Sequence, residues 1–201
     1  MNTISLLLIS DTHGCTDYTP LSDDAYLGID ACICMGDIYE TELRRIKEET
    51  DKHNLQCYAI PGNHEPKDAI DKEGFTNFHG KVIEIGGLHI AGWGGCKKYK
   101  EADDVLFMTN KESDQFADTL PKADILISHS NPYRDNQNNP HSGLSGITRY
   151  LQKTKPTPLH FYGHIHERIE NPKGYCIYKA AKVKITKMFV FYYSVDIEWV
   201  L

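Results

Sequence analysis

Five short groups of polar side chains stand out in this 201-residue chain as candidates for chemistry. They are Asp11-Thr-His13, Gly36-Asp37, Gly62-Asn63-His64-Glu65, Ser128-His129 and Gly163-His164-Ile-His166. Together they supply carboxylates, imidazoles and one amide, which are oxygen and nitrogen ligands suited to divalent first-row metal ions. Two such ions side by side would withdraw charge from a phosphate ester and acidify a water molecule. The residue types therefore predict hydrolysis of phosphate esters.

Each group directly follows an apolar run that is typical of a buried β-strand. The runs are Leu6 to Ile9, Ala31 to Met35, Cys57 to Ile60, Asp124 to Ser128 and Leu159 to Tyr162. In α/β proteins, ligands bind beyond the carboxyl ends of the strands. A random scatter of histidines and aspartates would not fall at these ends. The position of the five groups at strand ends therefore supports a metal site independently of their residue types.

The pattern of strands and helices expected along the chain predicts an α/β sandwich. In it two sheets face each other, helices cover the outside, and the strand ends position the polar groups. A helix is expected over 40–53, which makes the first third β-α-β-α-β with parallel strands. Gly86-Gly87 between two alternating runs predicts a hairpin over 82–91. Further helices are expected over 111–120 and through Tyr150, and antiparallel strands over 175–181 and 188–201. We find no linker or repeat and expect a single domain over 1–201.

The spacing within the groups suggests how they hold metal. Asp11 and His13 are two residues apart, so both can point to one side of an extended segment, and the same holds for His164 and His166. Asp37 follows a glycine and is our candidate for a carboxylate that bridges two ions. The set is completed by Asn63, which offers a neutral oxygen, and by His129.

In this order the groups resemble the calcineurin-like metallophosphoesterase family, whose pattern is D-x-H, G-D, G-N-H-[D/E], H and G-H-x-H. The resemblance implies a four-layer αββα sandwich of two mixed sheets flanked by helices. It also implies two metal ions, one held by Asp11, His13, Asp37 and His166 and the other by Asp37, Asn63, His129 and His164. His64, beside a ligand but not one itself, would donate a proton to the leaving group.

Manganese is the expected metal, and iron, zinc and nickel also fit such ligands. The sequence after Gly36-Asp37 lacks the arginine of the G-D-x-x-D-R-G pattern that marks protein phosphatases of this family. Because His64 suits esters with poor leaving groups, we expect a phosphodiesterase that acts on a small nucleotide or a similar phosphodiester. The alternatives are a phosphomonoesterase or protein phosphatase of the same fold, and a metal-binding scaffold without catalytic activity.

Three further residues are candidates for substrate contacts. Arg134 and His141 lie in a polar segment over 131–142, and the guanidinium of Arg134 could bind a phosphate or remain a solvated charge. Trp93 precedes two glycines and could stack on a ligand or pack in the core. Glu65 could support the metal-binding loop or cap the following helix.

Net charge, apolar runs and cysteine spacing limit which partners and which cellular compartment we expect. The formal charge of -6 shows no global basic face, so a small phosphoester is expected as partner and long nucleic acid is not. No run is long enough to span a bilayer, and the first ten residues lack the features of a signal peptide. The six cysteines, Cys15, Cys32, Cys34, Cys57, Cys96 and Cys176, show no metal or redox spacing and are expected to be free thiols. A cytoplasmic protein is the expectation that follows.

Overall fold

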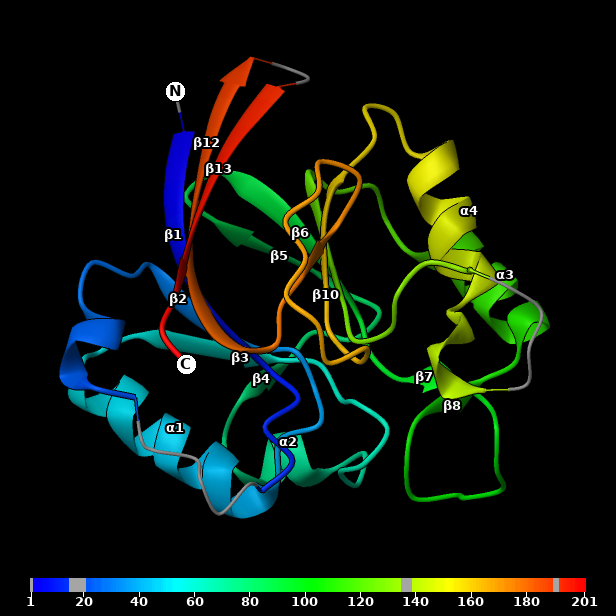
Figure 1. Ribbon diagram of the computed structural model, residues 1–201, viewed down its shortest axis with the longest axis horizontal. Coiled ribbons are helices and arrows are strands. Elements are labelled where there is room, and N and C mark those ends of the chain that lie inside the picture. The colour runs from blue at the N-terminus through cyan, green and yellow to red at the C-terminus, as the bar shows by residue number, and fades with distance from the viewer. Residues whose placement is uncertain (1, 15–20, 135–138, 190–191) are drawn as a thin grey trace.

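Two β-sheets packed face to face form the centre of the molecule, as the computed structural model in Figure 1 shows for residues 2–14, 21–134, 139–189 and 192–201. One sheet has six strands: β1 (Asn2–Ser10), β2 (Ala31–Cys34), β3 (Gln56–Ala59), β4 (Thr76–Asn77), β12 (Lys179–Phe189) and β13 (Tyr192–Trp199). The other has five: β5 (Val82–Ile85), β6 (Leu88–Trp93), β9 (Ile125–Ser128), β10 (Leu159–Tyr162) and β11 (Tyr175–Cys176). A small third sheet pairs β7 (Cys96–Lys97) with β8 (Phe107–Met108).

Most strands lie beside a strand that is near them in the sequence, but β12 pairs with β1 from the other end of the chain. The six-stranded sheet runs β13-β12-β1-β2-β3-β4, in which β1 to β4 are parallel and β12 and β13 form an antiparallel hairpin beside β1. The five-stranded sheet runs β11-β10-β9-β6-β5, with only β5 antiparallel to its neighbour. Both large sheets are therefore mixed.

Helices complete the outer layers. α1 (Glu40–Lys52) and α2 (Ala69–Lys72) cover the six-stranded sheet, and α3 (Asn110–Thr119) and α4 (Ser145–Lys153) cover the five-stranded one. Two short 3-10 helices lie at Asp23–Tyr26 and Pro140–Ser142. The result is the four-layer αββα sandwich that the sequence predicted.

The apolar runs are continuous because the central strands are buried on both faces. In β1, Leu6 and Leu8 face the space between the sheets, whereas Leu7 and Ile9 pack beneath the helices. All four side chains are fully buried. Burying an aliphatic side chain of this size contributes roughly 1.5–3 kcal/mol. These contacts fix where each strand ends and therefore where the polar groups begin.

Most of the expected elements are confirmed, and the last strands differ. The hairpin at Gly86-Gly87 and the helices expected over 40–53, 111–120 and through Tyr150 lie where the sequence predicted. The first helix of the expected β-α-β-α-β pattern is, among the described residues, only the 3-10 helix Asp23–Tyr26. The expected strand over 175–181 is wrong, because the chain leaves one sheet after Cys176 and enters the other at Lys179, which has a left-handed φ of 67°. Its first part, β11, pairs parallel with β10 and not antiparallel.

The expected strand over 188–201 starts too early, because Met188 belongs to β12. None of the helices in the described part of the chain combines the length and the apolar character that a bilayer span requires. Of the six cysteines, Cys15 lies outside the described residues, and the other five are buried and unpaired.

A buried histidine next to the functional edge makes the fold sensitive to acid. The Ser128 hydroxyl donates to the Ser130 carbonyl, so its oxygen accepts from Nε2–H of His160 at 2.8 Å. Burial lowers the pKa of His160 to about 3 from its ordinary 6.5. Between these values the unfolded chain binds a proton that the folded chain does not. The stability that the neutral His160 contributes is therefore fully present above pH 6.5 and is lost as the pH falls towards 3.

We predict that wild-type protein loses roughly 2 kcal/mol more of its unfolding free energy than the His160→Gln variant between pH 7.5 and pH 5. Urea unfolding at the two pH values, with a chelator present, measures this loss for each of the two proteins. Every other titrating group is common to the two proteins and cancels from the difference. Equal losses in the two proteins would show that His160 is not held neutral.

Candidate metal centre

The candidate ligands sit where strands end, and most of them adopt an unusual backbone conformation. Five of the seven have φ values between 54° and 69°, in the left-handed region: Asp11, His13, Asp37, His164 and His166. For residues other than glycine this conformation costs of order 1 kcal/mol each. It persists because each ligand segment follows a buried strand and is tied to its neighbours by hydrogen bonds. The Asp11 amide donates to the Gly36 carbonyl at 3.0 Å, and the His13 amide donates to the Asp37 carbonyl at 3.1 Å. Such strain concentrated at strand ends is typical of a functional site.

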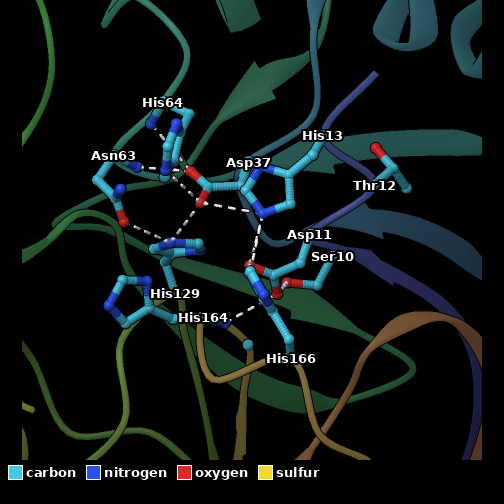
Figure 2. A network of polar contacts seen from close by, with 12 residues as sticks. Ser10, Asp11, Thr12, His13, Asp37, Asn63, His64, His129, His164 and His166 are labelled. Atoms are coloured by element: carbon cyan, nitrogen blue, oxygen red, sulfur yellow. Dashed lines mark hydrogen bonds and ion pairs between the residues drawn. The ribbon is translucent and has the colours of Figure 1, made fainter. Parts of the chain in front are cut away.

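The first group of ligand atoms joins one end of β1 to the chain after β10. Nε2 of His13 and Nε2 of His166 are 2.9 Å apart. Oδ1 of Asp11 lies 3.5 Å from the His166 nitrogen and 3.9 Å from the His13 nitrogen. Figure 2 shows the two imidazoles converging on this carboxylate from opposite segments of the chain. These three side chains could hold one ion.

The second group is more deeply buried. Nε2 of His129 lies 3.5 Å from Oδ2 of Asp37 and 3.1 Å from Oδ1 of Asn63. The imidazole of His164 packs against that of His129 with ring centroids 4.9 Å apart. Asp37, His129 and His164 could hold a second ion, with Asn63 beside them.

Asp37 connects the two groups through a single oxygen. Its Oδ1 accepts the backbone N–H groups of Asn63 at 2.7 Å and His64 at 3.0 Å. Its Oδ2 lies 3.8 Å from Nε2 of His13 in the first group and 3.5 Å from Nε2 of His129 in the second. The two oxygens thus have separate tasks. Oδ1 fixes the loop that carries Asn63, and Oδ2 faces both groups of ligand atoms.

Three buried atoms provide the test of whether cations fit. Oδ1 of Asp11, Oδ2 of Asp37 and Nε2 of His164 have no hydrogen-bond partner among the described residues. A buried carboxylate oxygen without a partner is costly, because it has lost its water. The two carboxylate oxygens face imidazole nitrogens of the site at 3.5 to 3.9 Å, and donor atoms spaced in this way can share an ion. The donor set fits divalent cations.

Hydrogen bonds orient the ligands from behind. The imidazole of His129 donates from Nδ1 to the Met35 carbonyl at 2.9 Å, which leaves Nε2 free to face Asp37. Oδ2 of Asp11 accepts from the Ser10 hydroxyl at 2.6 Å and from the backbone N–H of His164 at 2.8 Å. This last bond ties a ligand loop of one sheet to a ligand loop of the other.

Buried carboxylates and imidazoles shift one another's pKa values at this site. Burial would lower the pKa of His129, but the negative charge of Asp37, whose Oδ2 lies 3.5 Å from Nε2 of His129, raises it to about 10. Burial would likewise raise the pKa of Asp37, and His129 holds it well below its usual range. Burial and the charge of His129 lower the pKa of His164 to about 3. A proton on His129 thus compensates part of the charge that a cation would neutralise.

Two glutamates brace the ligand loops. Glu65 accepts the backbone N–H groups of Asp37 at 2.9 Å and Gly62 at 2.7 Å, so it supports the loop and does not cap a helix. Burial and the charge of Asp37 raise the pKa of Glu65 to about 8. The sequence prediction missed Glu42, which accepts from the Thr12 hydroxyl at 2.8 Å and the Gly14 amide at 2.9 Å. One acidic residue in a polar helix gave no signal of this role.

Trp93 corrects one prediction. Its ring is fully buried and packs edge-on against Phe116 and Tyr150, so the interpretation as a stacking platform for a ligand is wrong. The glycine that follows has a structural reason instead. A Cβ atom on Gly94 would lie 2.6 Å from the carbonyl oxygen of Pro61, which shows that this turn packs directly against the Gly62-Asn63-His64 loop.

The two other candidates for substrate contacts lie beside the centre. His141 is exposed, and its ring contacts that of His164 edge-on, with centroids 4.9 Å apart. Arg134 is exposed and lines a pocket of about 260 Å³ together with Tyr162 and Lys173. His141 therefore contacts a candidate metal ligand directly, whereas Arg134 lines a neighbouring pocket.

Comparison with known proteins agrees with this geometry. A model of the calcineurin-like phosphoesterase family matches residues 4–168, a range that contains every candidate ligand. The chain belongs to the calcineurin-like phosphoesterase family. A search of curated proteins found no match. Members of this family are metal-dependent phosphoester hydrolases that use divalent metals, which accounts for the clusters of histidine and aspartate at the strand ends.

The left-handed backbone gives a prediction for a ligand position of this phosphoesterase. In metal-free protein, the His166→Gly variant should be more stable to unfolding than His166→Ala by about 1 kcal/mol, because φ is 54° there and only glycine adopts it without strain. Urea unfolding of both variants with a chelator measures the difference.

His141, in a 3-10 helix, provides the matched control. There the order should reverse, with His141→Ala the more stable of the pair. If alanine were the better residue at both positions, the ligand loop would carry no backbone strain.

Proposed function

We propose that this protein hydrolyses phosphodiesters at a pair of divalent metal ions and acts on a small nucleotide or a similar diester. The observation that carries the proposal is Oδ2 of Asp37, which has no hydrogen-bond partner in the described part of the chain and faces both groups of ligand atoms. One ion would be held by Asp11, His13, Asp37 and His166, and the other by Asp37, Asn63, His129 and His164. When bound, the ions supply positive charge beside the phosphate oxygens and an acidified water.

His64 is the residue that we assign to the leaving group. Its side chain is 42% exposed, about as much as that of His166, and its ring contacts that of His13 edge-on, with centroids 4.9 Å apart. Its backbone N–H is fixed by Oδ1 of Asp37. Nε2 of His64 lies 3.9 Å from Oδ2 of Asp37. A proton donor at this place would protonate the departing oxygen, as an alkyl or ribose ester requires.

Manganese is the metal that we propose, since nitrogen and oxygen donors with a bridging carboxylate suit it. We also propose a reducing, cytoplasmic setting. Support comes from the five described cysteines, which are buried and unpaired although Cys32 and Cys34 lie close together on β2.

The experiment for this function compares two chromogenic substrates. Purified protein loaded with Mn²⁺ should hydrolyse bis(p-nitrophenyl) phosphate faster than p-nitrophenyl phosphate. A preference for the monoester would identify a phosphomonoesterase. Absence of both activities in protein that retains metal would identify a scaffold.

The His64→Ala variant should lose about 10²- to 10⁴-fold in kcat on a dinucleoside monophosphate, because a ribose oxygen leaves poorly without a proton. The loss on bis(p-nitrophenyl) phosphate should be much smaller, since p-nitrophenolate is a stable leaving group. Metal content should not change. His89→Ala, an exposed histidine on β6, is the matched control and should behave as wild type. Equal losses on the two substrates, or a loss of metal, would remove His64 from the role of proton donor.

A further inference from the structure

A surface pocket of about 360 Å³ opens beside His64 and is lined by Tyr39, Glu40, Thr41, His64, Glu65 and Pro66. On the proposed function, on which this inference rests, the group that leaves phosphorus must lie next to His64. The pocket is therefore in the place where a leaving group would sit. Its lining should match the chemistry of that group.

Tyr39 forms a flat aromatic wall. Its side chain is exposed, with 41% of the residue accessible. The ring lies across Gly14, where an added Cβ atom would be only 2.3 Å from Cδ2 of Tyr39. The ring is thus placed against the Asp11-Thr-His13 loop, and its outer side remains accessible. An exposed aromatic ring held in this way suits the stacking of a planar group.

The charge of the pocket limits what that group can carry. Among the described residues that line it, none is lysine or arginine, and Glu40 adds an exposed carboxylate. The first turn of α1 is not left open to an anion, because it contains Glu40 and Glu42, and Glu42 accepts the backbone N–H of Tyr39 at 3.1 Å. Arg44 and Lys72 interact with Glu40 from outside this lining. Within the lining a second phosphate would meet the Glu40 carboxylate and no cation, whereas hydroxyl and amino groups could donate to Glu40 and Thr41.

We propose that this pocket selects a nucleoside as the leaving group, in preference to a small alcohol or to a nucleotide that bears a further phosphate. In the reaction, the oxygen of water forms a bond to phosphorus. The bond from phosphorus to the nucleoside oxygen breaks, and its electron pair stays on that oxygen. His64 supplies the proton that completes the hydroxyl, and the proton lost by water passes to solvent. The products are a nucleoside and a phosphomonoester.

One substrate can report the choice of leaving group directly. Adenosine 5′-(methyl phosphate) can yield adenosine and methyl phosphate, or AMP and methanol. The Mn²⁺-loaded wild type should give the first pair in about tenfold excess, because stacking of a base on an aromatic side chain is worth about 1–3 kcal/mol. In Tyr39→Leu the ratio of the two pairs should move towards one. Tyr39→Phe should keep the wild-type ratio, as should Tyr192→Leu, a change in an exposed tyrosine of β13.

A second substrate tests the charge. A 3′-phosphate on the adenosine should lower the share of nucleoside release, and Glu40→Gln should restore part of it. A separate measurement needs no activity: in NMR spectra of metal-free protein, adenosine should shift the amide signals of Thr41 and His64 in wild type and much less in Tyr39→Leu.

The outcomes separate this inference from the proposed function. If bis(p-nitrophenyl) phosphate is hydrolysed while the product ratio is the same in wild type and Tyr39→Leu, the pocket does not select the leaving group and the phosphodiesterase stands. Predominant release of methanol by the wild type would overturn the inference in the same way. If neither diester is hydrolysed by metal-loaded protein, the proposed function itself fails.

Discussion

Two carboxylates, Asp11 and Asp37, are only 1% exposed, and each keeps one oxygen without a hydrogen-bond partner among the described residues. In water such an oxygen would be fully solvated, so its burial must be compensated by charge. His129 and His166 provide part of this compensation, as the direction of their pKa shifts indicates. The rest of the site can be understood as the arrangement that brings further positive charge to these two oxygens.

Holding these groups together costs energy, which the sheets must offset. Left-handed conformations at five ligand positions oppose folding, and the partly unpaired buried polar atoms add to this. Stability comes from the apolar strands on either side and from braces such as Glu65 and Glu42, which satisfy the backbone amides of the ligand loops. The centre is thus the strained part of a fold whose core is otherwise well packed. Bound cations would relieve that strain electrostatically, which couples metal affinity to stability.

Much of the fold could be predicted because the central strands are buried on both faces and read as unbroken apolar runs. The strand Lys179–Phe189 was harder to predict, since lysines alternate with apolar residues there and the chain changes sheets just before it. At the site, the structure places the seven candidate ligands close together, and their assignment as metal ligands stays a prediction. What the sequence could not show was tertiary: that Trp93 is covered by α3 and α4, or that Glu42 reaches back to Thr12.

The central claim is that one carboxylate oxygen, Oδ2 of Asp37, lies between two cations. Anomalous diffraction from crystals soaked in Mn²⁺ tests it most directly, because it locates each ion without reference to activity. We predict two peaks about 3.5–4 Å apart, one beside Asp11, His13 and His166 and the other beside Asn63, His129 and His164, with Asp37 between them. A single peak, or two peaks that do not share Asp37, would contradict this account.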